Sequence, residues 1–331
     1  MRIVNVIVAA GLTLGVAAMA RADGEKVDLT PRFKAGESMT FKHRVVRTET
    51  MMILNVPAKA EEKAEEKTEG KGEGKGEGEK DGARRGDKAM MKQSWSVEQT
   101  AVYELRVVAA TETLTTLELE LKSIDASADL PQGKMSWKND QPEDDKDQRN
   151  TILQTYKPIV GGIVKMTLDA NGAVTEVKGD PRIRLEVGGT MAPMVQLMVG
   201  PDLVRARWSP VVWIKDGREP VGVGQTWTNS ESIPNRALGR FVYETRNTLK
   251  GVKDSMAEID IAGDIRLEPL ENGKAAAATL SEHSIAGSAV WDVKAGRMKS
   301  YTVTEKTHLD VSANGIPVVR DLDMTTTITR E

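Results

Sequence analysis

The chain contains no cysteine among its 331 residues. That absence excludes disulfides, thiolate metal sites, a nucleophilic cysteine and the acylated cysteine of a lipoprotein anchor. Aromatic residues make up only 4% of the sequence, so a hydrophobic core must rest mainly on Val, Leu, Ile, Ala and Met. The formal net charge of −3 lacks the basic excess that nucleic-acid binding needs, and we predict no nucleic-acid partner.

Sequence patterns of catalysis and metal binding are also missing. The three histidines, His43, His283 and His308, do not stand at metal-ligand spacing, and no His-Glu-x-x-His pattern occurs. There is no Gly-x-Ser-x-Gly nucleophile motif and no phosphate-binding loop between a strand and a helix. We therefore predict no catalytic residues, no metal and no cofactor. A Ser/His/Asp arrangement assembled in space, and hence a hydrolase, is the less favoured alternative.

The N-terminus has the three parts of a secretory signal peptide. Arg2 supplies the positive charge, residues 3–20 are almost wholly apolar or small, and Ala20-Arg21-Ala22 fits the small-x-small cleavage rule. An uncleaved anchor helix is the alternative. Cleavage between Ala22 and Asp23 would make the mature protein periplasmic or secreted. No later apolar run approaches the ~18 residues of a transmembrane helix, so we predict no membrane span after cleavage.

One unit of the sequence occurs twice. Val102-Tyr103-Glu104-Leu105-Arg106 returns as Val242-Tyr243-Glu244-Thr245-Arg246, 140 positions later. An alternating run follows each Tyr after fifteen residues: Glu118-Leu119-Glu120-Leu121 in the first copy and Glu258-Ile259-Asp260-Ile261 in the second. Two separate elements with one common offset indicate an internal duplication.

Each copy has the alternation of an antiparallel sheet. In residues 117–122, Leu alternates with Glu and Lys, which places one kind of side chain on each face. Asn171-Gly172, between two further alternating runs, is a strong hairpin signal because both residues accept positive φ. Gly36-Glu37-Ser38-Met39-Thr40 and Gly224-Gln225-Thr226-Trp227-Thr228 introduce the two copies. We predict a mainly β protein, in which two duplicated antiparallel β-meander units form a curved sheet, a half-barrel or a sandwich, with a short helical linker.

These patterns divide the chain into a signal peptide (1–22), a first β unit (23–180), a helical linker (181–210) and a second β unit (211–331). Within the first unit, residues 58–92 form a charged low-complexity insertion with equal numbers of acidic and basic residues and no aromatic residue. Such a segment buries too little apolar surface to offset the entropy of ordering, and we predict that it is disordered. It is either a tolerated surface insertion or an arm that binds another envelope protein.

The linker and its surroundings concentrate the candidate ligand-binding residues. Methionines recur there at helical spacing, and three tryptophans fall within twenty positions of one another. Such Met and Trp side chains either pack in the core, which is the commoner role, or line an adaptable apolar pocket. Binding of cuprous copper by the thioethers is a more remote alternative. The candidates are Met191, Met194, Met198, Trp208, Trp213 and Trp227.

The order of these features resembles a group of secreted bacterial β-rich proteins that share a domain of unknown function. The resemblance rests on the signal peptide, the two Gly-Glu/Gln-Ser/Thr corners, the central helix, a late Asp-x-x-x-Gly turn and the run Pro220-Val221-Gly222-Val223-Gly224-Gln225-Thr226-Trp227. It would cover nearly all of the mature chain, and it implies no catalytic residues. More distantly, the architecture is similar to the periplasmic lipoprotein-carrier fold, an incomplete β-barrel with helices over its mouth, which implies the holding of acyl chains.

Together these observations favour a non-enzymatic extracytoplasmic protein. Its predicted function is to bind a lipid or another apolar ligand on a curved β-sheet, close to the junction that is rich in Met and Trp. The alternative is a cell-envelope scaffold or protein-interaction module, in which residues 58–92 bind an envelope protein. A fold shared by many functions does not decide between the two, so the site has to be argued from geometry.

Overall fold

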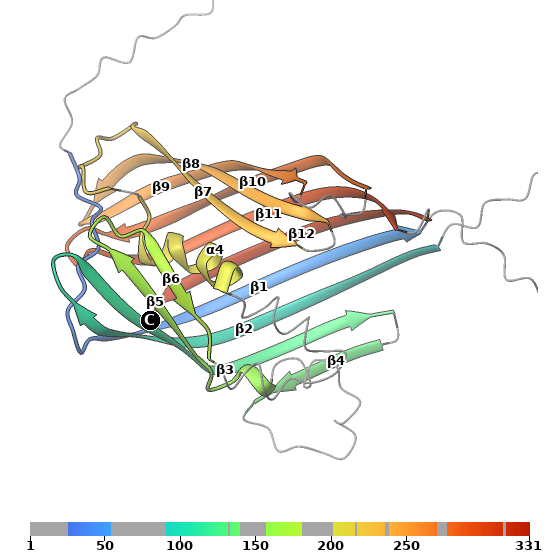
Figure 1. Ribbon diagram of the computed structural model, residues 1–331, viewed down its shortest axis with the longest axis horizontal. Coiled ribbons are helices and arrows are strands. Elements are labelled where there is room, and N and C mark those ends of the chain that lie inside the picture. Colours follow the sequence, from blue (N-terminus) through green and yellow to red (C-terminus); the bar gives the residue numbers. More distant parts are fainter. Residues whose placement is uncertain are drawn as a thin grey trace, which may run out of the picture.

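The computed structural model describes residues 26–53, 91–131, 133–139, 157–180, 201–215, 217–235, 238–269, 277–313 and 316–331. Within these ranges, twelve β-strands form one antiparallel sheet that curves around a hollow without closing into a barrel (Figure 1). The predicted curved, mainly β architecture is confirmed, and of the arrangements that the sequence left open the chain adopts the curved sheet. The signal peptide and residues 58–90 of the insertion lie outside the described residues and stay predictions.

Each β unit contributes six strands to the sheet. The first unit contains β1 (Ser38–Ile53), β2 (Met91–Ala110), β3 (Leu114–Leu130), β4 (Gly133–Lys138), β5 (Ile163–Asp169) and β6 (Val174–Lys178), with a 3₁₀ turn, η2 (Lys157–Ile159), before β5. The second contains β7 (Thr226–Asn235), β8 (Gly239–Lys253), β9 (Met256–Glu268), β10 (Ala277–Asp292), β11 (Arg297–Ala313) and β12 (Ile316–Arg330). Between them stands α4 (Pro201–Val212), the one α-helix of the described residues.

The two units join edge to edge. The strand order across the sheet is β6-β5-β3-β2-β1-β12-β11-β10-β9-β8-β7, and β4 pairs with β3 off this path. Strands β1 and β12 form the seam between the units. They pair antiparallel from Phe41, opposite Arg330, to Ile53, opposite Val318. Because that pairing is continuous, the second unit extends the sheet of the first instead of packing against it.

The duplicated sequence has a duplicated backbone geometry. Gly36 and Gly224, which open the two copies, both have positive φ (82° and 80°), a conformation that glycine adopts without strain. The Gly36 N–H donates to the Val107 carbonyl at 2.8 Å, and the Gly224 N–H donates to the Leu249 carbonyl at 2.7 Å. Each unit therefore enters the sheet through the same corner, which is tied to the second strand of that unit.

The Asn171-Gly172 turn joins β5 to β6, as the alternating pattern predicts. Gly172 has a φ of 85°, and its N–H donates to the Asp169 carbonyl at 3.0 Å. The ring of Trp213 covers this turn so closely that a Cβ atom on Gly172 would lie 1.4 Å from Trp213 Cε3. The turn thus requires glycine both for its backbone conformation and for the packing of Trp213.

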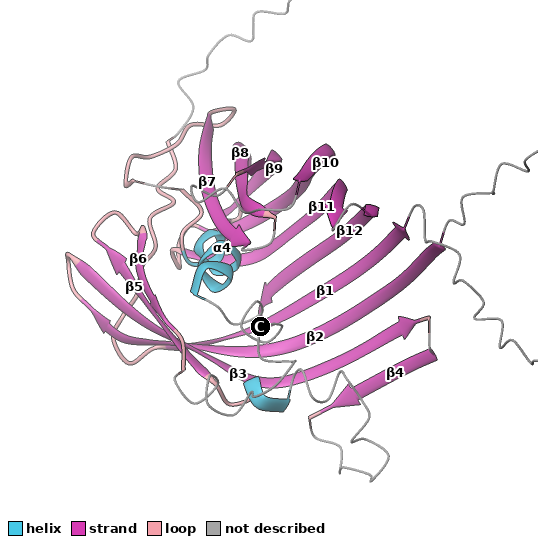
Figure 2. Cartoon of the chain, turned by 45° about the vertical axis from the view of Figure 1, so that its right-hand side comes forward, coloured by secondary structure: helices cyan, strands magenta, loops and turns pink. Residues whose placement is uncertain are grey.

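Helix α4 lies in the hollow of the sheet (Figures 1 and 2), where it contacts both edge strands, β6 and β7, and the central strand β11. Val204, Trp208 and Val211 recur at helical spacing, and all three are buried. Asp202 in the first turn suits the positive end of the helix dipole, and the helix ends soon after Pro210. The helix therefore presents one apolar face to the inner face of the sheet.

Two details differ from the sequence prediction. β2 begins at Met91, which pairs with Ile53 of β1, so the last two residues of the predicted disordered insertion belong to a strand. β4 has no predicted counterpart, because its six residues contain just two large apolar side chains, Met135 and Trp137, and so short an alternation is a weak signal. The described helix covers the end of the predicted linker, and residues 181–200 lie outside the described part of the chain.

Candidate ligand site in the hollow beneath α4

A small cavity of about 40 Å³ lies between α4 and the inner face of the sheet. Its walls come from α4, from β1, β2, β3 and β5, and from the turn around η2. A largely apolar enclosure in which a few polar groups converge is the usual form of a small-molecule site. Besides Gly162, the lining residues are the apolar Leu119, Leu121, Ile159, Val164, Val204 and Trp208 and the polar His43, Gln99, Tyr103 and Arg207.

Strand alternation places three rings of the sheet beneath the helix. Phe41 and His43 are two positions apart on β1, and Tyr103 stands opposite Phe41 on β2, so all three point to the same face. The Trp208 ring meets Tyr103 and Phe41 edge-on, with ring centroids 5.0 and 5.7 Å apart, and lies 6.4 Å from His43. Contacts of this geometry are favourable, so the aromatic cluster holds α4 against the sheet.

His43 is a buried polar group without a polar partner. Its exposed fraction is 1%, and neither ring nitrogen has a hydrogen-bond partner in the described part of the chain. Burial, with a smaller contribution from the Arg207 guanidinium, lowers the His43 pKa to about 3. The imidazole is therefore neutral at physiological pH, and it brings one N–H donor and one bare acceptor to the cavity wall. An unpaired buried group of this kind costs roughly 1–3 kcal/mol.

Arg207 on α4 supplies positive charge to the hollow. Its guanidinium acts on the pKa values of His43 and Tyr103 on the side of the first unit. It acts likewise on Tyr243 and Glu305, which belong to the second unit. Among the described residues Arg207 forms no ion pair. The hollow therefore contains a cation that interacts with the described groups around it electrostatically, at longer range than an ion pair.

The acid that Arg207 acts on is Glu305, a half-buried residue of β11. Burial raises the pKa of Glu305, and the Arg207 guanidinium opposes that rise. Burial also raises the pKa values of Tyr243 and Tyr301, and the charge of Glu305 adds to both shifts. Glu305 and Arg207 therefore interact electrostatically without forming an ion pair.

The internal duplication builds the floor of this hollow. Tyr103 and Tyr243 occupy equivalent positions of the repeated motif, one on β2 and the other on β8. Both side chains are half-buried, and the same guanidinium, Arg207, acts on the pKa of each. Arg207 of α4 thus acts on one copy of the repeated Tyr in each unit.

Past α4, the inner face continues along the seam between β1 and β12. Glu49 is 3% exposed and pairs with two arginines, Arg47 on its own strand and Arg320 on β12. Two guanidinium groups and one carboxylate leave a net single positive charge at this point. Half-buried apolar side chains share the inner face with this ion triad; they are Val45, Met51, Ile53, Leu322 and Met324.

The structure separates the residues that the sequence singles out as candidates. Trp208 lies in the cavity wall. Trp213 packs on the turn at Gly172, and the Trp227 Nε1–H donates to the Ile214 carbonyl at 2.8 Å, so neither lines the cavity. The remaining candidates lie outside the described residues; they are Met191, Met194 and Met198.

Sequence reasoning missed the polar residues of the cavity. The facing of His43 is ambiguous in the sequence because polar and apolar residues mix along β1. Tyr103 had a usable signal, since it is one of the residues that the duplication repeats. Arg207 had none, because its place depends on how α4 is rotated in the hollow. These positions are consequences of packing between elements that are distant in the chain.

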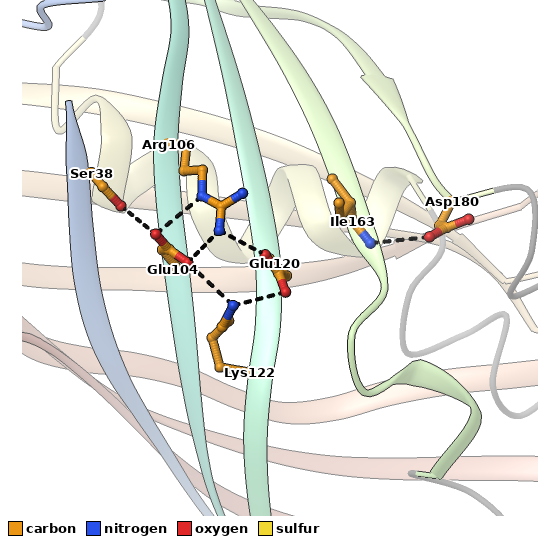
Figure 3. A network of polar contacts seen from close by, with 7 residues as sticks. All are labelled: Ser38, Glu104, Arg106, Glu120, Lys122, Ile163 and Asp180. Carbon is orange, nitrogen blue, oxygen red and sulfur yellow. Dashed lines mark hydrogen bonds and ion pairs between the residues drawn. The ribbon is translucent and has the colours of Figure 1, made fainter. Parts of the chain in front are cut away.

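The outer face of the sheet carries ion-pair networks. Glu104 accepts hydrogen bonds from the Ser38 hydroxyl at 2.7 Å and from Arg106 at 2.8 Å, and Lys122 lies 2.9 Å from Glu120 and 3.4 Å from Glu104 (Figure 3). The hydrogen bond from Arg106, followed by that from Ser38, lowers the Glu104 pKa to about 2. Pairs this exposed contribute little to stability, because solvent screens them.

A wider groove of about 530 Å³ also lies on the sheet, with Thr48 and Thr50 of β1 and Glu282 of β10 among its lining residues. Its other charged groups pair with one another, as in the contacts of His308 with Asp321 and of Lys306 with Asp323. No group of three or more His, Asp or Glu among the described residues is placed to hold a metal ion. The groove is more open than the cavity beneath α4, and its lining residues are polar or charged except for Leu322.

A comparison of the chain with protein-family models finds no match, and a comparison with curated proteins finds no significant match. The resemblance to secreted β-rich proteins and to lipoprotein carriers therefore stays a prediction from the sequence. Within the described ranges, no helix combines the length and the apolar character that crossing a membrane requires. The functional argument rests on the geometry of the hollow.

Proposed function

We propose that this protein binds an apolar ligand of the lipid type in the hollow between α4 and the curved sheet, without catalysing a reaction. One observation carries the proposal: the cavity beneath α4 has mainly apolar walls from several elements and also contains His43, whose two ring nitrogens are unpaired. An apolar ligand body would cover those walls, and the burial of apolar surface is the main source of affinity for such ligands. A polar group on the ligand would give His43 a partner.

The inner face has the length that a lipid chain needs. From His43 to Met51 the extended strand β1 rises by roughly 27 Å, at about 3.3 Å per residue. One leaflet of a bilayer holds acyl chains of roughly 15 Å, half the thickness of the hydrocarbon core. Because the cavity itself has a volume of only about 40 Å³, the body of such a ligand would lie along the seam, on the half-buried Val45, Leu322 and Met324.

Tryptophan fluorescence tests the proposal. Titration with a long-chain lipid should change the emission saturably, because Trp208 lies in the cavity wall. Trp208→Phe should remove most of the change and keep the binding stoichiometry when that is measured by calorimetry. Trp227→Phe is the matched control, since Trp227 does not line the cavity, and it should keep the response.

A variant that fills the cavity gives an independent test. Val164→Phe adds a ring at a lining residue of β5, and it should weaken lipid binding without lowering the melting temperature by more than a few degrees. A fluorescence signal that stays flat across a panel of lipids and detergents, in the unmodified protein, would contradict the proposed function.

We also propose that the protein acts outside the cytoplasm, as the N-terminal sequence predicts. Expression in a Gram-negative host should yield a mature chain that begins at Asp23. The intact mass of the protein released by osmotic shock measures this directly. Recovery of the full-length chain in the cytoplasmic fraction would count against the assignment.

A further inference from the structure

We infer that the ligand of the hollow is an amphiphile with a carboxylate head group, and that Arg207 of α4 binds this carboxylate beside His43 and Tyr103. The inference rests on the proposed function and specifies its ligand. Three features of the hollow carry it: a cation without an ion pair, a buried histidine without a hydrogen-bond partner, and a cavity that both residues line.

Arg207 carries a positive charge that has no ion-pair partner among the described residues. A guanidinium stays protonated in proteins, so its charge must be balanced by solvent or by an anion. Among the described residues Arg207 forms no ion pair, and Glu305 is the acid that acts with it at longer range. The described part of the protein therefore balances this charge only through the more distant Glu305, without an ion pair. A carboxylate fits the fork of a guanidinium with two parallel hydrogen bonds.

The ring of His43 has hydrogen-bonding capacity that the described part of the protein does not use. The neutral His43 ring has one N–H donor, and its two nitrogens have no partner in the described part of the chain. A carboxylate oxygen can accept that N–H while the other oxygen faces Arg207, and Tyr103 borders the same space. A hydrocarbon alone would leave the His43 nitrogens unpaired. An alcohol head group could pair with His43 but would not balance the charge of Arg207.

The volume of the cavity decides which part of the ligand it can hold. The cavity volume of about 40 Å³ suits a head group or one or two ordered waters, which need upwards of about 10–15 Å³ each. Water could satisfy His43, so bound water without a head group is the main alternative occupant. The tail would then follow the inner face of β1 and β12, past the triad of Arg47, Glu49 and Arg320. In that triad both arginines are already paired with Glu49.

A comparison of two probes with the same tail separates these possibilities. Calorimetric titrations of the purified protein at pH 8, below the micelle concentration, use dodecanoate and 1-dodecanol. The unmodified protein should bind dodecanoate about tenfold or more tightly than the alcohol, because a charge-assisted pair is worth about that factor. Arg207→Met should abolish the preference, and the conservative Arg207→Lys should restore part of it.

Three further variants place the head group. Arg44→Met removes the same charge from an exposed pair with Glu98 on the outer face, so it should keep the full preference for dodecanoate. Arg320→Met removes one of the two arginines of the triad on the inner face and should keep it as well. His43→Leu should lower the affinity for both probes, because either head group can pair with the ring, and should keep part of the preference for dodecanoate. Circular dichroism and the melting temperature verify that each variant is folded.

The outcomes are distinct. Equal affinities for the two probes in the unmodified protein would overturn the inferred head group and leave the proposed function standing, with water in the cavity. A preference that survives in Arg207→Met and disappears in Arg320→Met would overturn the placement at α4. Absence of binding for both probes would overturn the proposed function itself.

Discussion

His43 shows how the inner face departs from a simple apolar core. Alternation along β1 puts its ring on the same face as Phe41 and close to the rings of Tyr103 and Trp208. A leucine there would fill the same space without an unpaired donor or acceptor. The histidine therefore lowers stability in the unliganded fold, and that cost is consistent with a role in binding.

The buried His43 should make stability depend on pH. The folded state binds the His43 proton only near pH 3, whereas an unfolded histidine binds it near pH 6.5. The stabilising effect of keeping His43 neutral is thus present above about pH 6.5 and is lost as the pH falls toward 3. Relative to His43→Phe, the unmodified protein should lose about 1.4 kcal/mol of unfolding free energy per pH unit below 6.5.

Urea unfolding of both proteins at several pH values between 7.5 and 5 measures this difference. Other ionisable groups are common to the two chains, so their contributions largely cancel. Parallel pH profiles would mean that His43 is hydrated or paired in the folded protein, and that the cavity beneath α4 is more polar than its walls indicate.

Gly172 and Gly36 have similar backbone conformations but different surroundings, so substituting each one separates the cost of packing from the cost of backbone strain. Their φ values are 85° and 82°, but Trp213 occupies the Cβ position at Gly172, while nothing lies within 4 Å of that position at Gly36. Gly36→Ala should therefore cost about 1 kcal/mol, from the left-handed conformation alone. Gly172→Ala should cost several kcal/mol, because the Trp213 ring must also move. Equal losses in chemical denaturation would contradict the packing at this turn.

At the scale of elements, the charged insertion is a connection between paired neighbours. Ile53 at the end of β1 stands opposite Met91 at the start of β2, so a tight turn can join the two strands. Loop length affects closure entropy weakly. Replacement of residues 54–90 by Asn-Gly should therefore leave the melting temperature within a few degrees of the original.

The same replacement examines the alternative role of the insertion. If residues 58–92 bind an envelope protein, pull-down of partners should fail for the shortened chain while its lipid binding is retained. Loss of the fold on shortening would show that the insertion contributes to the structure, which the register of β1 and β2 does not indicate.

At the scale of the whole molecule, the seam between β1 and β12 makes the two duplicated units one folding unit. Thr326 of β12 lies at the centre of that seam, opposite Val45 of β1 on one side and Val303 of β11 on the other. Thr326→Pro would break the ladder in a central strand and should cost about 3 kcal/mol or more.

Circular dichroism and tryptophan fluorescence should follow a single thermal transition in the unmodified protein, and in Thr326→Pro both should shift together to lower temperature. Thr326→Val, which keeps the branched shape, is the control and should change the midpoint little. Two separate transitions would instead mean that the units fold independently of the seam.

The sequence by itself determined what depends on local order along the chain: the alternation that makes strands, the Asn171-Gly172 hairpin, the repeat that puts Tyr103 and Tyr243 in equivalent places, and the Gly36 corner. These follow from side-chain periodicity and backbone conformation, which act between near neighbours. The sequence also singled out Trp208, though not its neighbours in the cavity.

Only the tertiary structure decided that the two units share one sheet, and that α4 turns Arg207 and Trp208 toward the hollow. Strand order and helix orientation depend on contacts between residues far apart in the chain, and no local pattern specifies them. His43 became a candidate for the same reason: its unpaired nitrogens are a property of the packing between β1, β2 and α4.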